Sequence, residues 1–312
     1  MDLNNIFNKS FVDIPSSKPK VRIPIPYVGM SNRPHYIKII DPFNSKKEIS
    51  LLADIRVLAN LPKLQRGLHM SRFEECLHKL DASRPKDLRN YVKKLCLLAK
   101  ETQAVNNCKV EVIANYEKNV EEKNGSGKAS HELIKLIVDY EINKNKEIIE
   151  VGMIVPFINA CPCTQRRGMR DFYKYLQKKK LDKKTIEELI KNAPLQAHTN
   201  GGTLQLSIKS DKVKIRDIYH ILEKTSPIVR ELLKGPDEHT LVKASHKLGL
   251  FCEDLAREAA LNTALHLKTL TNIDDTKVRI EVDADESVHF HNLYCEIDAT
   301  LGDLKKILKD KD

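Results

Sequence analysis

Two cysteines directly after a predicted strand are the residues of this sequence best suited to chemistry. The apolar segment 151–158 has the length and composition of a buried strand, and Cys161 and Cys163 flank the proline that ends it. A polar, cationic turn is expected to follow. Thiolates are good ligands for zinc and related divalent metals. Because the thiols are only two residues apart, we expect at most one of them to face a given point. The alternative is a pair of inert thiols at a strand end.

The later part of the chain offers histidines and carboxylates that could complete a metal site. The candidate ligands besides Cys161 are His198, Glu223, Glu286 and His289. His198 lies in a Gly-rich turn, so it needs strand pairing to bring it near Cys161; otherwise it is an ordinary loop residue. Glu223 lies at the end of a predicted helix.

The segment Glu286-Ser-Val-His289-Phe-His291 precedes the last predicted strand. Residues two apart in an extended chain share a face, so His289 and His291 are expected to face one cleft, with Glu286 close enough to join them. Imidazole and carboxylate groups serve both as divalent-metal ligands and as acid–base groups. The alternative is a surface turn with ordinary hydrogen-bonding histidines.

An acidic helix start offers a different chemistry. Asp237 lies near the expected N-cap and Glu238 in the first turn of the helix that follows Gly235-Pro236. The helix dipole alone favours acidic residues there. A carboxylate at this place could instead bind a guanine edge, whose ring N–H and exocyclic amine are adjacent donors.

Neither common Gly-rich phosphate-binding motif occurs in the sequence. Side chains and scattered main-chain amides would therefore have to hold the phosphates of any bound nucleotide. The candidates in the first half of the chain are His69, Ser71 and Arg72. Ser71 is also a plausible N-cap of the helix that follows, and helix capping and solvation explain Ser71 and Arg72 equally well.

Composition limits the class of protein. A chain of 312 residues suggests about two domains, or one duplicated domain. The hydrophobic share of 41% supports a real core, and the lack of Trp makes that core mostly aliphatic. The net charge of +10 favours anionic partners. However, no basic stripe is interleaved with aromatic residues, so we expect no nucleic-acid partner.

Cysteine usage and the absence of long apolar segments indicate the compartment. Seven cysteines, an odd number in a chain too large to need disulfides, predict reduced thiols. Residues 1–20 contain no apolar stretch of signal-peptide length, and no segment approaches the roughly 18 apolar residues of a membrane span. We therefore expect a cytoplasmic protein with no membrane partner.

The coarse order of elements repeats along the chain. The first half is predicted as strand, strand, helix, helix, strand, strand, at 36–40, 49–61, 72–80, 85–102, 108–116 and 131–142. The second half follows the same order at 147–158, 203–210, 215–224, 236–267, 276–282 and 293–297, with a break near Gly249 in its second helical segment.

This repetition predicts two similar modules. We expect an extended N-terminal arm at 1–35, a first module at 36–145, and a second module at 146–312 that contains the metal site. An insertion at 168–195, rich in Lys and Glu, has apolar spacing suited to two surface helices. A loop tip is expected at 121–130 and a short terminal helix at 301–308.

Taken together, these segments resemble the type IB GTP cyclohydrolases and their archaeal relatives, the MptA enzymes. The resemblance runs from about residue 14 to residue 298 and is carried by Gly67-Leu-His-Met-Ser-Arg-Phe73, Ala160-Cys-Pro-Cys163, Ala197-His198, Glu223-x-x-Ser226, Gly235-Pro-Asp-Glu238 and Glu286-Ser-Val-His-Phe-His291. The H-M-S-R, C-P-C and E-S-x-H-x-H segments in this order form a specific set. The chain departs from the family at His198-Thr-Asn-Gly201, where His-Asn-Gln-Arg is usual, and in its longer insertion.

The family has an α+β fold, the tunnelling fold (T-fold), with two tandem β-β-α-α-β-β modules in one chain. The resemblance implies this fold, and the element order agrees with it. It also implies a homodimer or homotetramer, and one divalent metal ion per subunit, with Fe²⁺, Zn²⁺ and Mn²⁺ all open.

The resemblance also implies residue roles. Cys161 is expected to be a metal ligand and catalytic, with His198 and Glu223 as co-ligands, while Glu286 and His289 are ligands or acid–base groups. Cys163 is a second or alternate thiol. The implied substrate-binding residues are Glu238 for the guanine, and His69, Ser71, Arg72 and His291.

The implied activity is hydrolytic opening of the imidazole ring of GTP with release of formate. In the type IB branch the product is 7,8-dihydroneopterin triphosphate, at the first step of folate and pterin biosynthesis. In the MptA branch it is the 2′,3′-cyclic phosphate, for methanopterin biosynthesis. The segment Ile14-Pro-Ser-Ser-Lys18 is more similar to the bacterial branch. Two other classes stay open: a T-fold nitrile reductase using NADPH, whose lysine-rich signature we do not find, and a non-catalytic metal- or RNA-binding protein.

Overall fold

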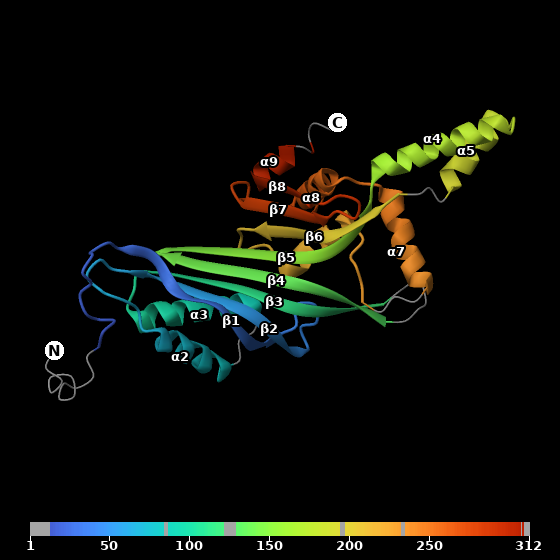
Figure 1. Cartoon of the computed structure of the whole chain (residues 1–312). Helices are drawn as coiled ribbons and strands as arrows, with labels where there is room; N and C mark the ends of the chain where they lie inside the picture. The colour runs from blue at the N-terminus through green and yellow to red at the C-terminus, as the bar shows by residue number, and fades with distance from the viewer. Residues whose placement is uncertain are drawn as a thin grey trace. The chain divides into compact units, whose positions relative to one another are not determined.

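The computed structural model describes residues 13–83, 87–121, 129–193, 197–231, 235–306 and 308. Its strands form one eight-stranded sheet in which they follow one another in chain order, β1 to β8 (Figure 1). The chain divides into two compact units, Met1–Ala114 with Ile137–Glu150, and Asn115–Leu136 with Val151–Asp312. Strands β3 (Asn107–Glu121), β4 (Ala129–Asn143) and β5 (Lys146–Ala160) therefore contribute residues to both units.

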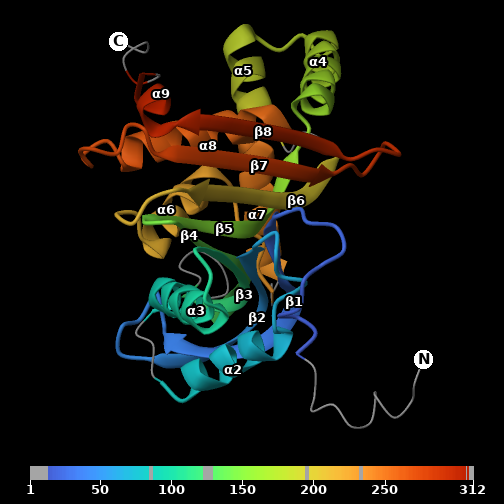
Figure 2. The same cartoon turned by 90° about the vertical axis from the view of Figure 1, so that its left-hand side faces the viewer.

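The first unit combines a strand pair with two helices. Strands β1 (Ile25–Ile40) and β2 (Glu48–Leu61) pair antiparallel, and β2 alternates buried and exposed residues as expected for a strand with one face in the core. Helices α2 (Met70–Asp81) and α3 (Leu88–Gln103) cover one face of these strands (Figure 2). Asp87 caps α3 by accepting a hydrogen bond from the amide of Asn90.

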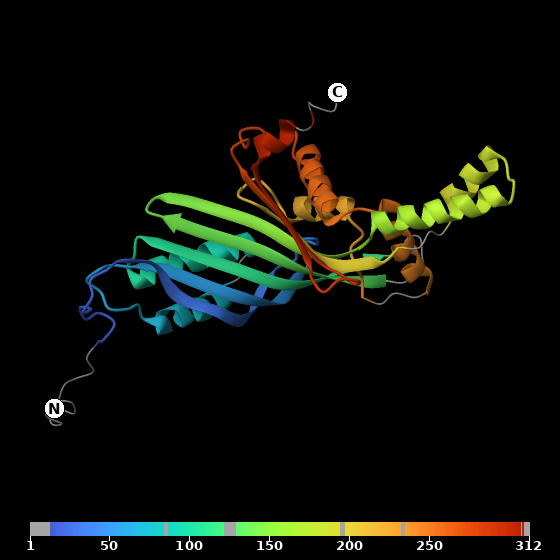
Figure 3. The same cartoon turned by 45° about the horizontal axis from the view of Figure 1, so that its top comes forward.

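The second unit is built on β5 and three further strands. Strands β6 (Thr199–Ile208), β7 (Lys277–Asp285) and β8 (Leu293–Thr300) follow β5 in antiparallel register. Helices α6 (Ile215–Thr225), α8 (Cys252–His266) and α9 (Leu301–Lys306) pack on these strands through apolar faces (Figure 3). Gly202 permits close approach of β6 and β7, because a Cβ there would lie 2.1 Å from the carbonyl oxygen of Asp283.

Three further helices belong to the same unit. Helix α4 (Pro162–Lys178) and helix α5 (Lys183–Asn192) form a hairpin after β5, and α7 (Gly235–Leu248) precedes α8. The two surface helices predicted for the insertion are therefore present. The predicted break between α7 and α8 is also present, at Gly249 with φ +50°.

Some predicted boundaries were wrong. The turn expected after Cys161 is the first turn of α4, because Pro162 ends the strand and also suits the first position of a helix. Strand β1 begins at Ile25, so residues 25–35, expected in the arm, pair with β2. Strand β6 begins at Thr199, four residues before the predicted start. The module boundary at 145/146 falls in the turn between β4 and β5 and stays a prediction.

Parts of some predicted elements lie outside the described residues. These are residues 1–12 of the arm, residues 85 and 86 at the start of a predicted helix, residues 122–128 of the loop tip, and residue 307 of the terminal helix. The buried side chains are mostly aliphatic, as the composition predicts. Within the described ranges, no helix is both long and apolar enough to cross a membrane.

Candidate metal and substrate site

Cys161 and His198 are held side by side where β5 ends and β6 begins. Ala160 pairs with Thr199 in the β5–β6 register, and the amide of Cys161 donates a hydrogen bond to the carbonyl oxygen of His198 at 3.0 Å. Cys161 is the N-cap residue of α4, and its half-buried Sγ accepts a hydrogen bond from Thr164 Oγ1 at 3.7 Å. The strand pairing expected to bring His198 beside Cys161 is present, while their roles as ligands stay a prediction.

Asn200 connects His198 to Glu286 across β6 and the end of β7. Its side-chain nitrogen donates to Glu286 Oε1 at 2.6 Å, and its oxygen lies 3.1 Å from His198 Nδ1. The main-chain amide and the hydroxyl of Ser287 both donate to the same oxygen. Asn200 itself is buried, with 6% of its surface exposed. We call Cys161, His198, Asn200, Glu286 and Ser287 the strand-end cluster.

One carboxylate oxygen of this cluster has no protein partner. Glu286 Oε2 is buried and accepts no hydrogen bond from the described residues. A buried carboxylate oxygen without a donor is costly unless a cation or a bound ligand satisfies it. Thiolate, imidazole and carboxylate are also the donor set that Zn²⁺ and related metals prefer. The strand-end cluster therefore fits a divalent metal by its donor chemistry.

The other predicted site residues of the second half also belong to the second unit. His289 and His291 are exposed, with their rings stacked on each other at a centroid distance of 5.2 Å. Glu223 lies near the end of α6, where one carboxylate oxygen accepts a hydrogen bond from Tyr219 at 3.4 Å and the other is 3.7 Å from His220 Nδ1. Cys163 is exposed in the first turn of α4. Printed contacts join Cys161, His198 and Glu286 through the main chain and Asn200. The roles of Glu223, Cys163, His289 and His291 stay predictions.

A second polar group surrounds the buried carboxylate of Glu132 on β4. Tyr219 donates to Glu132 Oε2 at 2.7 Å, and Arg230 Nε donates to Oε1 at 3.0 Å. Burial raises the pKa of the Glu132 carboxyl, and the hydrogen bond from Tyr219 opposes that shift. Sequence reasoning missed this network, since nothing local connects Glu132 with Tyr219.

Three other residues of the second unit form a possible metal triad. Glu117, His131 and Glu231 place ligand atoms within 4.8 Å of one another, and within the described ranges no other group of three His, Cys, Asp or Glu does so. His131 Nδ1 forms an ion pair with Glu117, and both carboxylates are exposed. The ligand atoms of Cys161, His198 and Glu286 therefore do not all lie within 4.8 Å of one another.

Glu238 lies on the exposed side of the first turn of α7, as the sequence predicts. Its neighbour Asp237 is buried, with 4% of its surface exposed, and lies close enough to Arg230 to interact with it electrostatically. An exposed carboxylate at a helix N-terminus is available to a ligand.

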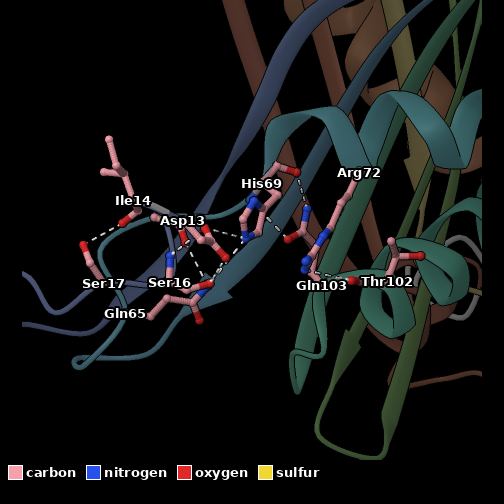
Figure 4. Close-up of polar contacts among 10 residues, drawn as sticks. Asp13, Ile14, Ser16, Ser17, Gln65, His69, Arg72, Thr102 and Gln103 are labelled. Atoms are coloured by element: carbon pink, nitrogen blue, oxygen red, sulfur yellow. Dashed lines mark hydrogen bonds and ion pairs between the residues drawn. The ribbon is translucent and has the colours of Figure 1, made fainter. Parts of the chain in front are cut away.

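The candidate phosphate-binding residues belong to the first unit, at the start of α2 (Figure 4). His69 Nε2 lies 3.4 Å from an Asp13 carboxylate oxygen. The side-chain nitrogen of Gln103 donates a hydrogen bond to the carbonyl oxygen of His69, and its side-chain oxygen accepts one from the His69 amide. Arg72 Nη1 donates to the carbonyl oxygen of Thr102 at 3.4 Å. Hydrogen bonds from Ser16 and the positive charge of nearby Arg72 lower the pKa of Asp13.

The structure brings His69 and Arg72 together and leaves Ser71 exposed beside them. The prediction that Ser71 caps this helix was wrong, because α2 begins at Met70 and His69 occupies the N-cap position. Sequence reasoning also missed Gln103 and Asp13, which lie far from His69 in the chain. For Asn200 a signal existed: residues 198 and 200 share a face in an extended segment.

Comparison with known proteins agrees with this architecture. The family model described as type I GTP cyclohydrolase folE2 matches residues 11–295 of the chain. GTP cyclohydrolase MptA of Methanococcus aeolicus is 31% identical over 315 residues, covering 96% of this chain and 100% of the relative. GTP cyclohydrolase MptA of Methanocaldococcus jannaschii is 29% identical over 310 residues, covering 95% and 97% respectively.

Among solved structures, uricase from Arthrobacter globiformis matches with a TM-score of 0.50 and 9% identity, covering 88% of this chain and 93% of the uricase. At this identity the likeness concerns the fold alone, and it confirms the predicted α+β tunnelling fold. The family match, in contrast, extends over nearly the whole sequence. The chain therefore belongs to the folE2 family of type I GTP cyclohydrolases, which are enzymes.

Proposed function

We propose that this protein opens the imidazole ring of GTP by hydrolysis, with release of formate and formation of a dihydroneopterin phosphate. Family membership over residues 11–295 supports the reaction class. The structural observation that carries the proposal is the strand-end cluster. There Asn200 contacts His198 and holds Glu286 through Oε1, while Glu286 Oε2 is buried without a partner among the described residues. The non-catalytic alternatives, a metal- or RNA-binding protein, do not account for membership of a family of GTP cyclohydrolases.

The proposed metal ligands are Cys161 and His198, with Glu223, Glu286 and His289 as further candidates. A bound divalent ion would lower the pKa of water toward neutrality and stabilise negative charge that develops in the reaction. Fe²⁺, Zn²⁺ and Mn²⁺ are the candidate metals. The side chains of Glu223 and His289 are exposed.

The chain's own groups have defined tasks in this proposal. The Glu238 carboxylate accepts hydrogen bonds from the guanine ring N–H and exocyclic amine. His69, Ser71, Arg72 and His291 contribute donors or positive charge for the phosphates. Water attack at C8 requires a proton for the purine nitrogen, and His289 or Cys163 serves as that acid.

Two products are possible, and one experiment separates them. We expect 7,8-dihydroneopterin triphosphate; the relatives named MptA favour the 2′,3′-cyclic phosphate as the second candidate. Metal-free protein is incubated with GTP and each metal in turn. Pterin fluorescence and formate report ring opening, and mass spectrometry distinguishes the triphosphate from the cyclic phosphate. No pterin with any of the three metals would overturn the proposal.

We also infer a cytoplasmic homodimer or homotetramer. Strands β1 and β8 are the first and last strands of the sheet, and sheet edges with unpaired main-chain groups favour pairing with another chain. Joining such edges between subunits closes the barrel that the tunnelling fold implies.

A further inference from the structure

We propose that Asn200 is a positioning residue that holds His198 with its imidazole proton on Nδ1 and orients Glu286 so that Oε2 faces the ligand position. This inference rests on the proposed metal site, and it assigns a role to a residue that the family motifs do not single out. Both interactions come from one buried side chain, with 6% of its surface exposed.

The orientation of the Asn200 amide follows from its neighbours. The main-chain amide of Ser287 can only donate, and it lies 3.3 Å from the Oδ1 position. The Glu286 carboxylate, in its ionised form, can only accept, and its Oε1 lies 2.6 Å from the Nδ2 position. A flipped amide would place donor against donor and acceptor against acceptor. The carbonyl oxygen of Asn200 therefore faces Ser287 and His198.

The orientation of Asn200 determines the tautomer of His198. His198 Nδ1 lies 3.1 Å from Asn200 Oδ1, which has no proton to give, so Nδ1 must carry the proton of a neutral ring. The Ser287 hydroxyl, 3.2 Å from Nδ1, can donate or accept and so does not force either tautomer. With the proton on Nδ1, the lone pair of the neutral imidazole lies on Nε2, so His198 can ligate a metal through that nitrogen.

The same side chain selects which Glu286 oxygen stays available. Asn200 occupies Oε1, and Oε2 is left buried without a partner among the described residues. The Asn200 amide thus leaves two atoms, His198 Nε2 and Glu286 Oε2, available to bind a metal. Groups that orient metal ligands in this way are typically worth 10–100-fold in metal affinity.

The test uses full-length protein without GTP, so that its result does not depend on cyclohydrolase activity. Asn200→Ala removes both hydrogen bonds. Asn262→Ala is the matched control, because Asn262 in α8 also donates through Nδ2, to Thr225 Oγ1 at 3.1 Å, in the same unit. Co²⁺ is titrated against a competing chelator, with thiolate-to-cobalt absorption as the signal, and thermal unfolding of the metal-free variants reports their folding.

We expect Asn200→Ala to weaken Co²⁺ binding by about 10–100-fold, and Asn262→Ala to leave binding unchanged at a comparable loss of thermal stability. Wild-type Co²⁺ affinity in folded Asn200→Ala would overturn the proposal. If Asn200→Ala does not fold, the tautomer remains testable in the wild-type protein. Proton-detected ¹⁵N spectra of metal-free protein, with His198 assigned by comparison with His198→Gln, should place its imidazole proton on Nδ1. A proton on Nε2 would equally overturn the proposal.

The two proposals fail separately. Protein that binds Co²⁺ through the strand-end cluster but does not convert GTP would refute the proposed function and leave the role of Asn200 intact. Cyclohydrolase activity that survives together with an unaltered Co²⁺ affinity in Asn200→Ala would refute the positioning role alone.

Discussion

The main-chain amide of Cys161 donates a hydrogen bond to the carbonyl oxygen of His198, 3.0 Å away, one step beyond the last pair of the β5–β6 register. This contact continues the strand pairing past Ala160 and holds the thiol and the imidazole of two chain segments at one place. Cys161 is also the N-cap residue of α4.

We predict that Cys161→Ala abolishes turnover and lowers the metal content, because the variant loses the thiolate ligand while the backbone hydrogen bond to His198 persists. Metal per chain is measured by mass spectrometry, alongside pterin fluorescence with GTP. Cys163→Ala is the matched comparison: its thiol is exposed in the first turn of α4, so this variant should keep its metal. Normal activity in Cys161→Ala would refute the central role of this thiol.

Glu238→Gln is expected to weaken GTP binding while leaving the metal in place. The amide loses a charge-assisted hydrogen bond to guanine, which costs about 1.5–3 kcal/mol. Binding is measured by calorimetry with GTP under conditions that prevent turnover, and metal content by mass spectrometry. Glu188→Gln, an equally exposed change on α5, serves as the control and should bind GTP normally. Loss of metal from Glu238→Gln would instead identify Glu238 as a ligand.

Tyr219→Phe should lower the free energy of unfolding by about 1.5–3 kcal/mol, because the buried Glu132 carboxylate loses the hydrogen bond that Tyr219 donates at 2.7 Å. Urea denaturation followed by circular dichroism measures the change. Tyr91→Phe provides a close control. The Tyr91 hydroxyl is equally buried but has no hydrogen-bond partner among the described residues, so its removal should cost little. Equal effects of the two changes would contradict the assigned role of the Glu132 network.

Active sites shared between subunits predict complementation. If His69 and Arg72 of one chain act beside the Cys161 of another, then Cys161→Ala and Arg72→Ala homo-oligomers are each inactive, but mixed oligomers contain some intact sites. The two variants are dissociated reversibly, mixed and reassembled, and GTP turnover is measured. Partial recovery is expected. A fully active monomer, established by light scattering under assay conditions, would rule out a shared site.

The sequence by itself determined much about this protein that depends on local pattern. The apolar run before Cys161 predicted β5, and the spacing in the insertion predicted the α4–α5 hairpin. Motif order predicted the tunnelling fold and the family. These inferences hold because periodicity, turn chemistry and family motifs are properties of short segments. Pro162 was misjudged because one residue type both ends strands and begins helices.

Only the tertiary structure decided which side chains meet. The Asn200–Glu286 hydrogen bond joins residues 86 positions apart, and the Tyr219–Glu132 bond joins residues 87 apart. Such contacts depend on strand order, register and helix packing. These are set by many weak interactions between distant parts of the chain, so no single segment determines them.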